Sequence, residues 1–278
     1  MPAPLNAALY VFEISGEHIL NDHCIVIKIH SDCVWVRSNS FMMELSSDKY
    51  KELYKKFLGV EDGAKSQVFL SENRSTPINN KYLHEIILSK ISDEFYCSTN
   101  FIRFDDCNAM YTNPLTVVDV FKRYYADLKA RNFERYIIRD ANRVSKEISP
   151  LRAFDIDALN VNESHKKRFI AKYSSALHLG LYFGLIKENK IVSHAYVSDI
   201  TNGLANIVVY TDFEYRGKGY ASLLLSNCVV ACYREGIYPM YLVESKNKIS
   251  KGLLKSFYVE LLAEEIIFSR EVDCYQYS

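Results

Sequence analysis

The sequence has little glycine, no excess charge of either sign and no long apolar run. Only 10 of its 278 residues are glycine, and 34 basic side chains balance 34 acidic ones. A neutral chain argues against a nucleic-acid-binding protein that depends on counterion release from phosphates. No apolar run reaches the roughly 18 residues of a membrane-spanning helix, and the N-terminal stretch MPAPLNAALYVFEIS lacks the basic start of a signal peptide. We therefore expect a cytoplasmic protein with no nucleic-acid partner and no membrane partner.

Metal-ligand and disulfide patterns are also missing from the sequence. The seven cysteines include no C-x-x-C pair, and the seven histidines are scattered. Structural metal sites need closely spaced ligand pairs, so we expect no metal. An odd number of cysteines without a secretory signal favours reduced thiols. Cys228, on an amphipathic stretch, is expected to pack as a small hydrophobic residue.

The length and composition predict a soluble protein of two domains. A chain of 278 residues is long enough for two globular units, and 49% apolar and 24% charged side chains are typical of a soluble protein. In the first half, residues 8–14 and 24–30 alternate like strands, and residues 48–57, 81–90 and 115–130 are interpreted as helices. We expect an N-terminal mixed α/β domain over 1–133 and a second domain over 134–278.

Two of the scarce glycines stand within three residues, in the basic stretch Arg216-Gly217-Lys218-Gly219-Tyr220-Ala221. An apolar run ends at Thr211 before it, and an amphipathic stretch starts at Ala221 after it. This order predicts a strand, a tight turn and a helix. Glycines let the backbone approach an anion closely, and the first N–H groups of a helix favour negative charge. The stretch therefore predicts a cradle for a pyrophosphate.

The elements around this cradle are legible. Residues 153–173 suit one or two helices, and residues 181–187 and 191–197 read as a hairpin joined by Glu188-Asn189. A strand over 204–211 follows a turn at Asn202-Gly203. Apolar residues at three- and four-residue spacing predict a helix from Ala221 to just before Gly236. A short strand over 240–243, a helix from about 249 and strands near 264–269 and 272–277 complete the prediction.

The stretch 216–221 matches [RQ]-x-x-G-x-[GA] and thereby resembles the pyrophosphate signature of the GNAT superfamily of acyl-CoA N-acyltransferases. Residues 244–247, Glu-Ser-Lys-Asn, also look like that family's E-x-x-N. The resemblance covers 134–278 and implies an α+β fold with a mixed, splayed β-sheet. The two-part length resembles the glycine N-acyltransferase and FR47-like branch, in which the first half is a degenerate acyltransferase-like unit.

The resemblance also implies where acetyl-CoA, or another acyl-CoA, would bind. The backbone of the strand before the cradle would pair with the pantetheine arm, the cradle would hold the pyrophosphate, and an Asn would contact the pantetheine or fix the turn after the next strand. The implied binding residues are Val209, Tyr210, Thr211, Arg216, Gly217, Lys218, Gly219, Tyr220, Ala221 and Asn247.

The general base departs from the family pattern. Related enzymes often carry a Glu ten or eleven residues before the cradle Arg, but here those positions are Ala205 and Asn206. His194 and Glu244 are the substitutes, although His194 suits a packed core histidine and Glu244 suits a helix cap equally well. For the general acid we consider Tyr258, which lies one helical turn beyond the family position and is also compatible with a structural role.

Together these features predict an N-acyltransferase, with N-acetyl transfer from acetyl-CoA to a primary amine as the first interpretation. The alternative is a non-catalytic acyl-CoA-binding regulatory protein, for which the missing Glu would be an argument. Release of CoA in the presence of an acceptor distinguishes the two. The residues name neither the acceptor nor the oligomeric state.

Overall fold

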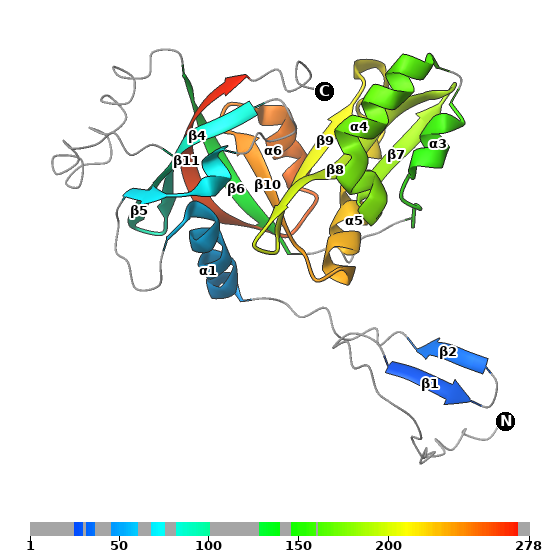
Figure 1. The fold of residues 1–278 in the computed structure, drawn as a ribbon, viewed down its shortest axis with the longest axis horizontal. Coiled ribbons are helices and arrows are strands. Elements are labelled where there is room, and N and C mark those ends of the chain that lie inside the picture. The colour runs from blue at the N-terminus through cyan, green and yellow to red at the C-terminus, as the bar shows by residue number, and fades with distance from the viewer. Residues whose placement is uncertain are drawn as a thin grey trace. The chain divides into compact units, whose positions relative to one another are not determined.

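The computed structural model describes residues 25–29, 32–36, 46–60, 68–75, 82–100, 128–139, 146–159 and 161–271 (Figure 1). The chain forms two compact units, Met1–Met43 and Glu44–Ser278. In the first unit, β1 (Ile25–Ile29) pairs with β2 (Asp32–Val36) in an antiparallel hairpin. The strand expected at 24–30 is confirmed.

The second unit is built on one nine-stranded sheet with the order β3-β5-β4-β11-β6-β10-β9-β8-β7 (Figure 1). Its strands are β3 (Val68–Leu70), β4 (Tyr82–Ile91), β5 (Glu94–Thr99), β6 (Lys129–Ile138), β7 (Tyr182–Lys187), β8 (Lys190–Thr201), β9 (Leu204–Thr211), β10 (Tyr238–Glu244) and β11 (Val259–Glu271). The pairs β3–β5 and β9–β10 are parallel, and the remaining pairs are antiparallel. The expected mixed α+β architecture is confirmed.

Helices cover both faces of this sheet. They are α1 (Ser47–Leu58), α3 (Ala153–Asp157), α4 (Glu163–Leu179), α5 (Tyr220–Arg234) and α6 (Lys248–Leu254), with 3₁₀ turns η1 (Glu72–Ser75) and η3 (Phe213–Tyr215). Side chains alternate between the faces of a strand. Ala205 and Ile207 of β9 pack with α5, whereas Leu204 packs with α1 and Val208 packs with α3 and α4. We call these the α5 face and the α1/α4 face.

The turns of the second half follow the sequence prediction. Glu188 and Asn189 have φ of 50° and 61°, and Asn202 and Gly203 have φ of 53° and 77°. Two consecutive left-handed residues give the hairpin turn that matches strand twist. Helix α5 starts next to the cradle. Its residue Cys228 is fully buried in the hydrophobic cluster between α5 and the sheet, as expected for a small hydrophobic residue.

The helix predicted over 81–90 is wrong, because these residues form strand β4. Most of β4 is buried on both faces, since Ile87 and Ile91 pack in the cluster with α1 and Ile86 and Leu88 pack in a second cluster. A strand buried on both sides shows a continuous apolar run rather than alternation, and such a run resembles a buried helix. The predicted helix 48–57 is confirmed as α1. The predictions over 8–14, 272–277 and most of 115–130 lie outside the described residues.

Strand β6 connects the two halves of the sequence. It pairs with β10 on one side and with β11 on the other, for example Met240 with Ile137 and Glu264 with Glu134. The expected boundary between residues 133 and 134 falls inside this strand. Strands from both halves therefore share one sheet in the unit Glu44–Ser278.

Candidate active site

Strands β9 and β10 separate from one another along their length. Their parallel pairing consists of Leu204 with Tyr238, Ala205 with Pro239 and Asn206 with Met240. From Ile207 onward β9 keeps its partner β8, but the described strands offer it no ladder on the β10 side. A strand with an open edge can accept an extended ligand as an added strand. We call the point where pairing stops, at Asn206 and Met240, the vertex.

The cradle follows the open end of β9. Gly217 and Gly219 have φ of 74° and 77°, and no atom of the protein lies within 4 Å of a Cβ built on either residue. Helix α5 starts at Tyr220, and the first backbone bond into it runs from Leu223 N–H to Gly219 C=O. The N–H groups before Leu223 thus have no helical acceptor. Open space, positive φ and free N–H groups suit an approaching anion.

The two basic side chains of the cradle contact residues between the end of β9 and the start of α5. Arg216 Nε donates to the carbonyl oxygen of Thr211 at 3.1 Å, and its guanidinium lies 5.6 Å from the ring centre of Phe213. Lys218 Nζ lies 4.9 Å from the Tyr215 ring centre. Both cations remain in the turn that joins β9 to α5, where they add positive charge beside the helix N-terminus.

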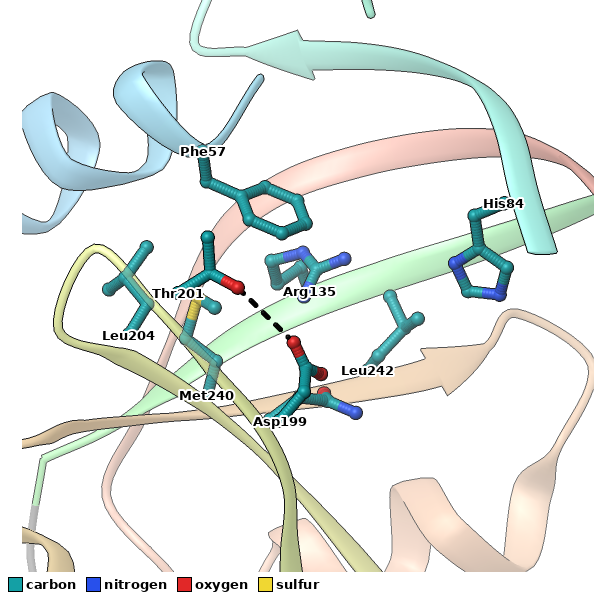
Figure 2. Close-up of a pocket in the computed structure, with 9 residues that line it drawn as sticks. Phe57, His84, Arg135, Asp199, Thr201, Leu204, Met240 and Leu242 are labelled. Atoms are coloured by element: carbon teal, nitrogen blue, oxygen red, sulfur yellow. Dashed lines mark hydrogen bonds between the residues drawn. The ribbon is translucent and has the colours of Figure 1, made fainter. Parts of the chain in front are cut away.

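A small cavity with a mixed polar and apolar lining lies at the vertex, on the α1/α4 face (Figure 2). Its volume of about 20 Å³ holds one water-sized group. The lining residues come from α1, β4, β6, β8, β9 and β10; they are Phe57, His84, Arg135, Asp199, Thr201, Leu204, Asn206, Met240 and Leu242. Asp199 and Asn206 lie opposite one another in the β8–β9 ladder. Burial raises the pKa of the Asp199 carboxyl above its usual value.

A β-bulge turns Asp199 toward this cavity. The register of β8 against β9 shifts between Val197 and Asp199, and Ser198 is the extra residue. Val197 packs on the α5 face, so strict alternation would place Asp199 there too. The bulge moves it to the opposite face, next to Asn206. Ser198 Oγ fixes the bulge by donating to the Asn206 carbonyl oxygen at 3.1 Å. Bulges commonly re-aim side chains next to active sites.

A buried ion pair supports the wall of the cavity. Arg135 Nε lies 2.7 Å from Glu265 Oε1, Arg135 Nη2 lies 3.1 Å from Oε2, and both side chains are buried. Tyr54 donates its hydroxyl hydrogen to the same carboxylate. Arg74 is also buried, stacks on Phe57 at 4.4 Å and has no hydrogen-bond partner for Nε or Nη1. Burial lowers the pKa of Arg74 to about 10.

His194 lies inside an aromatic cluster. Its ring centre is 5.6 Å from the ring centres of Tyr182, Tyr196 and Tyr210, and 6.1 Å from that of Tyr173. Burial, and next the charge of Lys172, lowers its pKa to about 4. The imidazole is therefore neutral at pH 7, and the residue is partly buried.

The other expected side chains lie around the ends of β10 and α6. Glu244 is the last residue of β10 and pairs with Phe133 of β6. Asn247 caps α6, because its Oδ1 accepts the Ser250 N–H at 3.0 Å. Asn247 thus lies where the chain passes from β10 to α6. Tyr258 lies just before β11 and is 66% exposed.

Asp199 lines the cavity and was not among the candidates from the sequence. A signal for it was present, because a two-residue turn at Asn202-Gly203 alone places Thr201 opposite Leu204 and Asp199 opposite Asn206. Ala205 and Asn206 are the two positions at which the resemblance implies a Glu. The Asp199 carboxylate lies on the adjacent strand β8, opposite Asn206.

Within the described ranges, no cluster of three or more His, Cys, Asp or Glu side chains could hold a metal ion. No helix among these residues is long and apolar enough to cross a membrane.

Comparison with known proteins identifies one family. The family model described as GNAT acetyltransferase matches residues 111–258, more than half of the chain. No curated protein matches the sequence. One similar solved structure is a GNAT-family protein from Novosphingobium aromaticivorans, with 14% identity and a TM-score of 0.39 over 52% of this chain and 66% of that chain. A second is an acetyltransferase from the GNAT family from Colwellia psychrerythraea, with 10% identity and a TM-score of 0.41 over 63% of this chain and 77% of that chain. A third is a GCN5-related N-acetyltransferase-like protein from Streptococcus suis, with 15% identity and a TM-score of 0.39 over 81% of this chain and 100% of that chain. The chain thus spans just under two thirds of the length of the first. Since every TM-score is below 0.5, the family assignment rests on the family model.

Proposed function

The chain belongs to the GNAT acetyltransferase family, whose members use an acyl-CoA as co-substrate, and we propose that it transfers an acetyl group from acetyl-CoA to a primary amine. The single observation that supports this most directly is the separation of β9 from β10. It leaves one edge of Ile207–Thr211 open and leads from the vertex to the cradle.

In this proposal the cofactor-binding residues act mainly through their backbone. Val209, Tyr210 and Thr211 offer the open edge of β9 to the pantetheine amides. The stretch Arg216–Ala221 takes the pyrophosphate on its free N–H groups, with Arg216 and Lys218 supplying positive charge. Asn247 holds the start of α6 close to the end of β10.

Acyl transfer to an amine also needs side chains that accept and donate protons. His194, Glu244 and Tyr258 remain candidates, each on the position described above. Direct transfer to the amine needs a proton acceptor for the amine and a stabilised thioester oxygen, for which a β9 N–H at the open edge is suited.

The alternative function is acyl-CoA binding without turnover. Ala205 and Asn206 at the usual Glu positions favour it, because neither side chain accepts a proton. Both functions predict binding of acetyl-CoA, but only the enzyme consumes it.

The test is acceptor-dependent thiol release. The full chain is incubated with acetyl-CoA and a panel of primary amines that contains amino acids, polyamines, aminoglycosides and peptides, and free CoA is measured. We expect release above the amine-free rate with at least one amine, and an acetylated product of matching mass. Tight binding of acetyl-CoA by calorimetry without release by any amine would favour the alternative.

A further inference from the structure

The vertex cavity presents hydrogen-bond acceptors that the protein does not fully use. Asn206 Nδ2 donates to Ser198 Oγ at 3.2 Å, but Asn206 Oδ1 is buried and has no partner. The Asp199 carboxylate accepts two long bonds, one of 3.4 Å from Thr201 Oγ1 to Oδ1, drawn in Figure 2, and one of 3.3 Å from Ser198 Oγ to Oδ2. Two adjacent strands therefore aim an amide oxygen and a carboxylate at the same small space.

The chemistry of this space fits an amino group. Asn206 Oδ1 has no donor, the Asp199 carboxylate can accept further bonds beside its two long ones, and an amine nitrogen supplies two N–H groups. The volume of about 20 Å³ admits a group of that size and excludes a chain or ring. Leu204, Met240 and Leu242 form the apolar part of the lining, which favours a neutral ligand group over a hydrated one.

Burial and the neighbouring charges have opposite effects on the pKa of Asp199. Arg135 of β6 and Arg74 of η1 both lower the pKa of Asp199, against the larger effect of burial. Glu265 of β11 is engaged by Arg135, and His84 of β4 is neutral at pH 7 because burial and neighbouring arginines lower its pKa to about 3. The nearby guanidinium groups repel an ammonium ion, so they favour the neutral amine that attacks a thioester.

The position of the cavity agrees with such a role. Asn206 is the last residue of β9 that pairs with β10, and the open edge begins at the next residue, Ile207. A ligand that enters along this edge from the cradle ends at the cavity. The amine site and the inner end of the acyl-CoA groove therefore meet at the vertex.

We propose that Asp199 and Asn206 bind the acceptor amine at the vertex and that Asp199 accepts its proton during acyl transfer, in place of the Glu missing from β9. This inference rests on the proposed function. The amine lone pair forms a bond to the thioester carbonyl carbon, the N–H proton passes to the Asp199 carboxylate, and the C–S bond breaks. The sulfur leaves with the bonding electrons and takes up a proton, so amide and free thiol are the products.

The first experiment replaces Asp199 by Asn, which keeps size and removes the basic oxygen. With the best amine of the panel, we expect kcat/KM to fall about 100-fold or more. We also expect the acid limb of its pH profile to disappear, because that limb follows protonation of Asp199. The Kd for acetyl-CoA should stay within twofold. Asp157→Asn makes the same chemical change at an exposed position of α3 and should leave all three quantities unchanged.

The second experiment exchanges the two side chains. The variant Asp199→Asn with Asn206→Asp keeps one carboxylate and one amide at the vertex, but on opposite strands. We expect it to recover at least tenfold of the activity that Asp199→Asn loses, together with an acid limb. Recovery would not occur if Asp199 only stabilised the bulge.

The outcomes separate the two proposals. Normal kcat/KM and an intact acid limb in Asp199→Asn would overturn the role of Asp199 and leave the acetyltransferase proposal standing. A large loss that the exchange does not repair, with unchanged acetyl-CoA binding and unfolding midpoint, would overturn proton acceptance at the vertex. No CoA release by the wild-type chain with any amine would overturn the proposed function itself.

Discussion

The cradle and the vertex lie beyond opposite ends of the open edge of β9, and they are built on different principles. The cradle consists of backbone, with two left-handed glycines in open space and the free N–H groups of α5. The vertex consists of side chains from six elements, supported by the buried pair Arg135–Glu265. Backbone sites are specified by a short stretch of sequence, whereas side-chain sites need the whole fold. We therefore expect changes at the cradle to affect ligand binding and changes beneath the vertex to affect folding.

The largest effect should come from the support of the vertex. Arg135→Met leaves Glu265 buried without its cation, and we expect a loss of about 3–5 kcal/mol in the free energy of unfolding, measured by urea denaturation. The double variant Arg135→Met with Glu265→Met should cost clearly less, because it leaves no uncompensated charge. Equal losses in the single and double variants would show that packing, and not charge pairing, holds this region.

The next effect should come from the cradle. Gly219→Glu places bulk and negative charge where we propose the pyrophosphate binds, and we expect a loss of at least about 100-fold in acetyl-CoA affinity by calorimetry, about 2.7 kcal/mol. Gly236→Glu is the matched control, because Gly236 also has positive φ and open space but lies beyond the far end of α5. Equal acetyl-CoA affinity in both variants would contradict the assignment of the cradle.

A smaller effect should appear in the pH dependence of stability. The pKa of His84 is lowered to about 3 by burial and the nearby arginines, so the unfolded chain takes up this proton first as pH falls below about 6.5. The free energy of unfolding should thus decrease from pH 7 to 4.5, and His84→Gln should remove about 1–3 kcal/mol of that decrease. Replacing the exposed His165 by Gln should not. An equal pH slope in wild type and His84→Gln would contradict this account.

The smallest effect should come from Tyr258. Because its side chain is 66% exposed, we expect Tyr258→Phe to change kcat/KM less than threefold. His194→Gln and Glu244→Gln measured beside it complete the comparison of the candidate proton-transfer groups. A fall of tenfold or more in one variant, with unchanged acetyl-CoA binding, would assign proton transfer to that side chain.

The sequence analysis predicted the turns, helices and strands that are determined by residues close together in the sequence. The turns at Glu188-Asn189 and Asn202-Gly203, helix α5 and the placement of β9 all follow from local backbone preferences and periodicity. Strand β4 was mistaken for a helix because burial on both faces erased its alternation. Asp199 was missed because the predicted strand 191–197 ended before it, whereas β8 continues to Thr201. The ion pair Arg135–Glu265 joins residues too distant in sequence for any spacing rule.

The place of β6 has a consequence for how the chain folds. This strand is flanked by β10 and β11, which are both synthesised much later, and β11 also completes the pairing of β4. During synthesis, β4 and β6 are complete long before their partners β10 and β11, because much of the second unit is translated in between. Contacts of such long sequence separation slow folding and leave strand edges exposed in the meantime. Because β11 lies between β4 and β6, we expect these two strands to join one sheet only after β11 has been synthesised.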